Sequence, residues 1–157
     1  MLIQFQNFLT FENIYLWINF GVLPFWLMMI FIPSSRFTNF FVNSIILPLI
    51  IASTYIYVVY QIIILDEPIF DVFKLYLSLD DLYTVFSNEG FLLIFWLHFV
   101  AINLFLGSWI SKDGTKYNIS KTLVFVPLLI TYLMGPVGLV FYWMIRIFFS
   151  KKLSFHE

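Results

Sequence analysis

Long apolar runs, separated by short polar segments, are the dominant pattern along the chain. A hydrocarbon core of about 30 Å takes roughly 20 residues of helix, so an apolar run of that length is long enough to cross a bilayer. Four such runs occur, at about residues 14–32, 37–65, 90–110 and 122–149. The pattern predicts an all-α integral membrane protein, with residues 1–157 forming a single transmembrane domain.

The segment between the second and third runs has a different pattern. Its polar residues recur every three or four positions, which places them on one face of a helix otherwise built from apolar and aromatic residues. They are Glu67, Asp71, Lys74, Ser78 and Asp81, with Asp80 outside the stripe. We expect an interfacial helix over residues 68–86, lying flat on the membrane as either a connector or a lid over a lipid-side entrance.

Prolines and glycines predict where the helices are interrupted. The pattern N-x-x-x-L-P occurs twice, ending at Pro24 and at Pro48, and each proline removes a backbone hydrogen bond, so we expect a kink at both. Gly135-Pro136 is expected to break the fourth run. The third connection, SKDGTKYNISK, is polar, and its Asp113-Gly114 pair predicts a turn.

The composition supports the membrane assignment and excludes several functions. The chain is 62% hydrophobic and 11% charged, far more apolar than a soluble domain, and its net charge of −1 gives no basic surface for nucleic acid. The lack of cysteine excludes disulfides, thiolate metal sites and a catalytic thiol. We predict no metal and no cofactor, because no ligand cluster or phosphate-binding motif occurs.

The charges around the runs do not orient the protein. If all four runs cross, four Lys and Arg residues lie on each side of the membrane, so the positive-inside rule is balanced. The first thirteen residues lack the Lys and Arg of a secretory signal, and they do not resemble an organelle import leader. We therefore expect a multi-pass protein of a bacterial inner membrane, or an organelle-encoded one.

His98 and Asn103 interrupt the apolar run FWLHFVAINLFLGSW. An ionisable group inside a bilayer is costly unless it faces protein or water, so an intramembrane histidine is a candidate for function. Five residues at 100° each place the two side chains about 140° apart on a helix, so each has to contact a different neighbour. His98 is either an interhelical hydrogen-bonding group or an acid or base near pH 7, and Asn103 either joins helices or binds a ligand.

The fourth run carries a further candidate face. Thr131, Gly135, Gly138 and Tyr142 follow spacings of four, three and four, which places small residues at the centre of one helical face. Such a face lets another helix, or a flat ligand, approach closely.

Several segments together resemble one family of small membrane proteins. They are LPFWLMMIFIP at 23–33, LP at 47–48, FSNEGFLLIFWLHFVAINLFLGSW at 86–109, Asp113, and PLLITYLMGPVGLVFY at 127–142. In these segments the chain is similar to the family named after the plant abscisic-acid-deficient-four protein, which is required for neoxanthin formation. A W-[ILV]-H segment followed by G-P-x-G is the distinctive part of the resemblance.

The resemblance implies an isomerisation in which a carotenoid 5,6-epoxide opens to an allenic alcohol without net redox change. Such a step needs an acid for the epoxide oxygen and a base for a vinylic proton, in a dry groove that fits a polyene. On this basis we expect catalytic roles for His98, Tyr142, Asp113 and Glu89. We expect the substrate groove to include Trp26, Trp96, Asn103, Thr131, Gly135 and Gly138.

Two positions depart from the pattern of the family. Asn103 and Ser108 stand where the family usually has an aspartate and an arginine. Losing one of two opposite charges would leave the other stranded in the membrane, so we interpret the family's two residues as a charge pair that this chain has lost as a whole. If the missing carboxylate is essential to the family's chemistry, this member has a changed activity; if the pair only joins helices, Asn103 and Ser108 replace it neutrally.

Three functions are therefore consistent with the sequence. The first is an isomerase or cyclase acting on a carotenoid or a related isoprenoid lipid, and the second is an accessory protein that binds such a lipid without turnover. The third is a small transporter, which would need a charged relay inside the membrane. The expected ligand is a membrane lipid or carotenoid, with a membrane partner or a second copy of the chain as a further possible partner.

Overall fold

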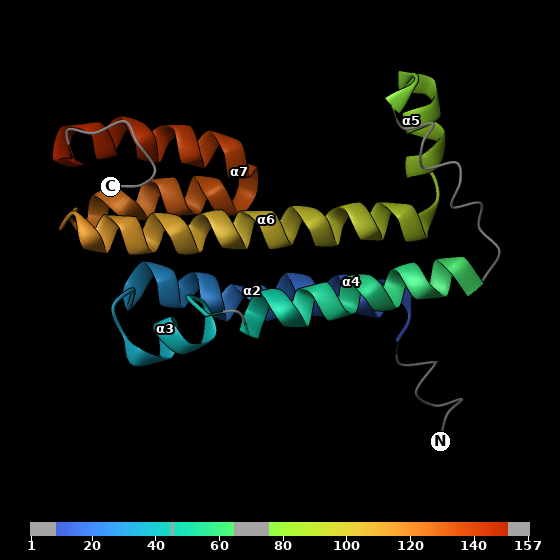
Figure 1. Cartoon of the computed structure of the whole chain (residues 1–157), viewed down its shortest axis with the longest axis horizontal. Coiled ribbons are helices and arrows are strands. Elements are labelled where there is room, and N and C mark those ends of the chain that lie inside the picture. The colour runs from blue at the N-terminus through green and yellow to red at the C-terminus, as the bar shows by residue number, and fades with distance from the viewer. Residues whose placement is uncertain (1–8, 45, 65–75, 151–157) are drawn as a thin grey trace. The chain divides into compact units, whose positions relative to one another are not determined.

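The computed structural model describes residues 9–44, 46–64 and 76–150, and this part of the chain is helical with no strand (Figure 1). The polar residues Glu67, Asp71 and Lys74 of the expected interfacial stripe lie outside the described residues. The helices are α2 (Phe11–Phe31), α3 (Arg36–Phe41), α4 (Ile46–Ile64), α5 (Leu79–Phe86), α6 (Glu89–Lys116) and α7 (Lys121–Ser150).

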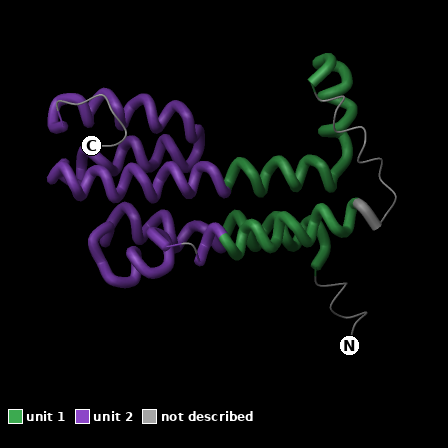
Figure 2. The backbone as a smooth tube through the Cα atoms, viewed as in Figure 1, with its two compact units in different colours: residues 1–20, 49–100 green, residues 21–48, 101–157 purple. Residues whose placement is uncertain are grey.

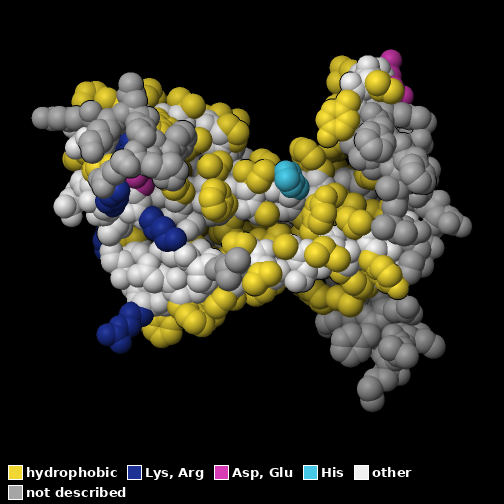
Figure 3. Space-filling model, viewed as in Figure 1, with side chains coloured by type: hydrophobic (Ala, Val, Ile, Leu, Met, Phe, Trp, Pro, Cys, Tyr) yellow, Lys and Arg dark blue, Asp and Glu magenta, His cyan; other side chains and the backbone are white. Residues whose placement is uncertain are grey.

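Four helical stretches are long and apolar enough to cross a membrane, which confirms the expected class of multi-pass membrane protein. They are Phe11–Phe31, Arg36–Ile62, Glu89–Lys116 and Lys121–Ser150. Large apolar side chains also cover much of the molecular surface, as the yellow groups in Figure 3 show. Phe20, Ile56 and Phe105, for example, are each about two-thirds exposed, at 67%, 67% and 66%. A surface of this kind is suited to lipid rather than water.

The second apolar run forms two helices, α3 and α4, rather than one kinked helix. The break lies at Val42, Asn43 and Ser44, and Pro48 is the third residue of α4. Proline is tolerated in the first turn of a helix. If one helix had continued through this segment, the ring of Pro48 would clash with the carbonyl of Ser44, four residues earlier. Pro24, by contrast, lies inside α2, which stays helical from Phe11 to Phe31.

The expected turn at Asp113-Gly114 is wrong, because α6 continues through both residues to Lys116. The helix ends at Lys116, and Asn118 follows two residues later with a φ of 52°, in the left-handed region that asparagine tolerates. The amide of Ile119 donates to the carbonyl of Gly114 at 2.9 Å, and the amide of Asn118 donates to Thr115 at 3.2 Å. These two bonds are the Schellman arrangement, which satisfies the last carbonyls of α6.

The fourth run, α7, folds back on itself at Met134, where φ is −143° and ψ is 58°. A Cβ atom placed on Gly114 of α6 would lie 2.9 Å from Val124 and 3.8 Å from the hydroxyl of Tyr142. In a straight helix these two α7 residues would be about 27 Å apart. The two arms of α7 are therefore antiparallel, as Figure 1 shows. The expected interruption near Gly135-Pro136 is thereby confirmed.

Each arm of α7 is short for a membrane crossing. Residues 121–133 and 135–150 extend over about 20 Å and about 24 Å at 1.5 Å per residue, against a hydrocarbon core of about 30 Å. The arms pack closely, since a Cβ atom on Gly138 would lie 2.6 Å from the Cα atom of Thr131. Gly138 therefore serves the contact between the arms of one hairpin, whereas Gly135 lies against Asn103 of α6.

The chain forms two compact units (Figure 2). Unit 1 comprises residues 1–20 and 49–100, and unit 2 comprises residues 21–48 and 101–157. The buried core of unit 1 consists of Ile14, Val58, Ile62, Leu93 and Leu97. Both arms of α7 belong to unit 2, together with α3 and the second half of α6.

The described part of the expected interfacial helix is α5. The hydroxyl of Ser78 accepts the backbone N–H of Asp81 at 3.1 Å, which caps the start of α5, and none of the helix's residues is buried. Its position on the surface of a membrane stays a prediction.

Candidate functional site

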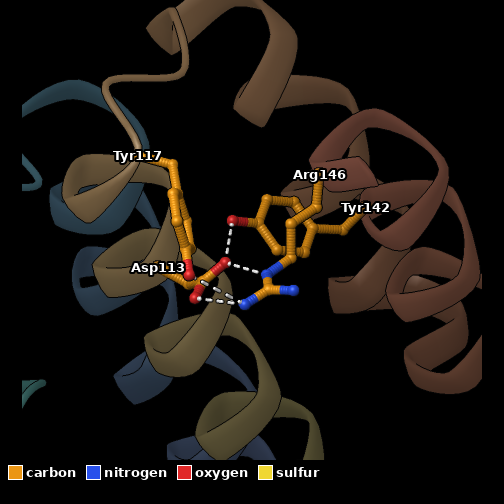
Figure 4. Close-up of polar contacts among 4 residues, drawn as sticks. All are labelled: Asp113, Tyr117, Tyr142 and Arg146. Atoms are coloured by element: carbon orange, nitrogen blue, oxygen red, sulfur yellow. Dashed lines mark hydrogen bonds and ion pairs between the residues drawn. The ribbon is translucent and has the colours of Figure 1, made fainter. Parts of the chain in front are cut away.

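A buried ion pair joins α6 to the second arm of α7 (Figure 4). Arg146 Nε donates to Asp113 Oδ2 at 2.6 Å, and its Nη2 donates to Oδ1 at 3.4 Å. Only 1% of Arg146 and 8% of Asp113 is exposed. A buried charge pair of this kind is stable only with good geometry and further hydrogen bonds.

Two tyrosines complete the hydrogen bonding of the pair. The Tyr142 hydroxyl donates to Asp113 Oδ2 at 2.7 Å, and the Tyr117 hydroxyl accepts from Arg146 at 3.4 Å. Each helix supplies two residues four positions apart, Asp113 and Tyr117 from α6 and Tyr142 and Arg146 from α7, because this spacing places side chains on one helical face.

Aromatic rings enclose the guanidinium group of Arg146. Its central carbon lies 4.6 Å from the ring centre of Trp143, 4.9 Å from that of Tyr117 and 6.0 Å from that of Trp109. Such cation–π contacts are favourable where water is excluded. We name Asp113, Tyr117, Tyr142 and Arg146 the ion-pair cluster; its contacts fasten the returning arm of α7 to α6.

A cleft of about 270 Å³ adjoins the ion-pair cluster within unit 2. Its apolar lining consists mainly of Met29, Ile30, Val124 and Leu128, and its polar lining carries hydroxyl, amide and ammonium groups. These polar groups belong to Ser34, Ser111, Thr115, Asn118, Ser120 and Lys121. Gly114 also lines the cleft, and the hydroxyl of Tyr142 lies 3.8 Å from the Cβ position of this glycine.

The polar lining of the cleft retains hydrogen-bonding capacity. Lys121 donates to the carbonyl of Phe31 at 3.4 Å, and Ser111 donates to the carbonyl of Met29 at 3.5 Å. Both bonds are at the long end of the accepted range, so they are weak. An ammonium group has three donors and a hydroxyl both donates and accepts, so these groups are able to bind a ligand oxygen.

Asn103 lies where α7 folds back. Its side-chain oxygen contacts Gly135, and only 4% of the residue is exposed. Its Nδ2 group is buried and has no hydrogen-bond partner among the described residues. Ser108, in contrast, donates to Asn43 Oδ1 at 2.8 Å. In this chain the two positions that we interpreted as a lost charge pair therefore contact different segments.

The structure brings together only two of the four expected catalytic residues, Asp113 and Tyr142. His98 is exposed on α6 in unit 1. Fifteen residues of continuous helix separate His98 from Asp113, which corresponds to about 22 Å. Glu89 is exposed at the first turn of α6, still further from Asp113. Catalytic roles for His98 and Glu89 stay predictions.

The residues expected to bind substrate are occupied by contacts within the protein. Trp96 donates through its indole N–H to Asn19 at 3.2 Å. Trp26 packs edge-on against Tyr132 with ring centres 5.4 Å apart, and it covers Gly107. The α7 hairpin uses the other expected substrate residues for its own packing: Gly138 lies against Thr131, and Gly135 lies against Asn103.

Sequence reasoning missed Tyr117 and the cleft residues Ser111 and Lys121. They were assigned to a polar loop, because Asp113-Gly114 is a common turn signal. The sequence did contain a signal for these two helical faces. Asp113 and Tyr117 are four positions apart, and so are Tyr142 and Arg146, which is the spacing of side chains on one face of a helix.

The fold and the ion-pair cluster define a class of α-helical, multi-pass membrane protein in which a helical hairpin is fastened by a buried charge pair. The chain belongs to the ABA DEFICIENT 4-like family, whose profile matches residues 13–142. This match confirms the family resemblance of the sequence. Comparison with curated proteins and with solved structures finds no match.

Proposed function

We propose that this protein binds the polar end of an isoprenoid lipid, a carotenoid or a related molecule, in the cleft of unit 2. The observation that carries this proposal is the lining of the cleft, which combines apolar side chains with polar ones. A lipid with an oxygenated end needs both kinds of surface, because its oxygen has to keep hydrogen bonds while its chain stays in an apolar environment.

The isoprenoid class is part of this proposal, and the family relationship supports it, since the plant protein after which the ABA DEFICIENT 4-like family is named is required for neoxanthin formation. The ion-pair cluster has a supporting role in this proposal. Asp113 already receives hydrogen bonds from both Arg146 and Tyr142, so its charge is balanced within the protein. These bonds hold the helix that carries Gly114 and the cleft wall.

A second candidate function is the isomerisation of an oxygenated carotenoid. It is favoured by the position of Tyr142, whose hydroxyl lies 3.8 Å from the Cβ position of Gly114, a residue that lines the cleft. In this reaction Tyr142 would give a proton to the epoxide oxygen as the C–O bond opens. The phenolate left on Tyr142 would take up the vinylic proton whose loss forms the allenic alcohol, which restores the hydroxyl. The product is an isomer of the substrate, so no oxidant or reductant is required.

Lipid retention tests the binding function. The protein is expressed in a carotenoid-producing host, purified in a nonionic detergent and analysed for bound lipid by mass spectrometry. Ser34 is an exposed cleft residue and Ser87 is exposed outside the cleft, so Ser34→Trp and Ser87→Trp form a matched pair. We expect Ser34→Trp to lose the lipid and Ser87→Trp to keep it. Equal retention by the two variants would refute binding in the cleft.

Analysis of isomeric products in the same host separates binding from catalysis. Tyr142→Phe removes the hydroxyl near the cleft, and Tyr117→Phe removes a hydroxyl elsewhere in the ion-pair cluster. A new isomer that disappears only with Tyr142→Phe establishes the isomerase. An isomer that disappears with His98→Gln instead locates the chemistry on the exposed face of α6. Bound lipid without any new isomer supports the binding function alone.

A further inference from the structure

We infer that the lipid head bound in the cleft carries an anionic phosphate group. The inference rests on the proposed function, because it specifies the ligand of the same cleft. It concerns the charge of the head group, which the family relationship does not indicate.

The charges near the cleft are the first argument. All five described Lys and Arg residues belong to unit 2, whereas four of the five described Asp and Glu residues belong to unit 1. Among the described residues of unit 2 the one acid, Asp113, is paired with Arg146. Lys121 therefore contributes a positive charge at the cleft that no described acidic residue pairs with, and none of the described residues that line the cleft is acidic. This arrangement favours an anionic head group over a cationic one.

The hydrogen-bond donors of the cleft are the second argument. A phosphate group presents several strong acceptor oxygens, which need several donors at once. Lys121 offers an ammonium group with three donors, and Ser34 and Ser120 add hydroxyls. The hydroxyls of Ser111 and Thr115 also line the cleft, but they already donate to backbone carbonyls. Lys121 is also the first residue of α7, where the helix dipole adds partial positive charge.

The apolar lining of the cleft indicates a lipid phosphate rather than a soluble one. Met29, Val124 and Leu128 are buried apolar residues of the lining, and a free phosphate ion has no favourable contact with them. The neighbouring Phe31 and Leu123 are exposed, at 63% and 41%. Lysines beside membrane helices commonly mark the level of the lipid head groups.

Native mass spectrometry of the full chain in nonionic detergent tests the inference with four probes: a polyprenyl monophosphate, the corresponding polyprenyl alcohol, phosphatidylglycerol and inorganic phosphate. Lys121→Gln removes the cleft charge, and Lys116→Gln removes an equal charge from a residue that does not line the cleft. We expect Lys121→Gln to weaken binding of the polyprenyl monophosphate about fivefold, the effect of one lysine near anionic lipid, with no change for Lys116→Gln.

The outcomes separate the inference from the proposed function. If the alcohol binds as tightly as the monophosphate and Lys121→Gln changes neither, the phosphate inference is overturned while lipid binding stands. If phosphatidylglycerol binds through Lys121 and neither polyprenyl compound binds, the phosphate head is supported and the isoprenoid class is refuted. If inorganic phosphate binds as tightly as the lipid phosphates, the lipid part of the inference is overturned.

Discussion

Arg146 is the largest fully buried side chain among the described residues, with 1% of its surface exposed. Moving a guanidinium out of water is costly, and the cost is offset here by Asp113, the hydroxyl of Tyr117 and the faces of neighbouring rings. The hydroxyl of Tyr142 in turn donates to the Asp113 carboxylate. At the scale of single residues, the stability of unit 2 therefore depends on keeping this set of partners complete.

Replacing Arg146 with glutamine should lower the free energy of unfolding by about 3–5 kcal/mol, because it leaves the Asp113 carboxylate buried without its counter-charge. Lys116→Gln is the control, since Lys116 is exposed and a surface substitution usually changes stability by less than about 0.5 kcal/mol. Denaturant unfolding of the purified protein in detergent provides the measurement. Equal stability of the two variants would contradict a stabilising role for the pair.

Tyr142→Phe should destabilise the protein more than Tyr117→Phe. The Tyr142 hydroxyl donates to a carboxylate at 2.7 Å, whereas the Tyr117 hydroxyl accepts a longer bond of 3.4 Å. Hydrogen bonds to charged groups contribute about 1.5–3 kcal/mol, so we expect a loss of that size for Tyr142→Phe and a smaller one for Tyr117→Phe. The same unfolding assay tests this order, and a larger loss for Tyr117→Phe would reverse the assignment.

At the scale of elements, α7 is the unit that differs most from a simple transmembrane helix. Its hairpin depends on the non-helical backbone of Met134 and on the glycines that let the two arms approach. Irregular backbone at membrane depth is tolerated where protein or a water-filled cavity surrounds it. Asn103 of α6, whose side chain contacts Gly135, provides part of this environment.

Adding a methyl group at Gly138 should therefore open the hairpin. In Gly138→Ala the new carbon would overlap the backbone of Thr131, which cannot move aside as a flexible side chain can. Gly21→Ala is a matched control, because nothing lies within 4 Å of the Cβ position of Gly21. We expect a loss of about 1–3 kcal/mol for Gly138→Ala and a gain of about 0.5–1 kcal/mol for Gly21→Ala. A neutral Gly138→Ala in the unfolding assay would argue against the packing of the arms.

At the scale of the whole molecule, the α7 hairpin changes the expected membrane topology. Because the second arm returns to α6 at Asp113, Arg146 lies at the same end of α6 as Lys112, Lys116 and Lys121. The count of four Lys and Arg residues on each side of the membrane assumed that α7 crosses it. Without that crossing, Arg146 joins the lysines at the basic end of α6, while Glu89 lies in its first turn. For this arrangement the positive-inside rule predicts that the basic end lies in the cytoplasm.

Cysteine labelling tests this topology on a background that contains no natural cysteine. Thr122→Cys reports the start of α7, Ser150→Cys its end, and Ser87→Cys the segment before α6. We expect Thr122→Cys and Ser150→Cys to react with a membrane-impermeant maleimide from the cytoplasmic side, and Ser87→Cys from the other side. If Ser150→Cys reacts together with Ser87→Cys, α7 crosses the membrane and the hairpin topology is wrong.

The amino-acid sequence by itself determined the membrane class, the family and the approximate extent of the helices. Apolar run length is enough for this, because a backbone in lipid has to satisfy its own hydrogen bonds and helices do so locally. It also determined the break at Gly135-Pro136, since proline removes a donor whatever surrounds it. The direction of the chain after such a break is not a local property.

Only the tertiary structure decided that α7 folds back and that Asp113 meets Tyr142 and Arg146. The aspartate is 29 positions from Tyr142, and helical periodicity reports which residues share a face but not which distant face they contact. His98 is a second example of this limit. Its polarity inside an apolar run marked it as a candidate functional residue, but whether its side chain is buried or exposed depends on the helices that pack against α6. The cleft arises where α2, α6 and α7 contribute side chains to one place, so it has no signature in any single segment.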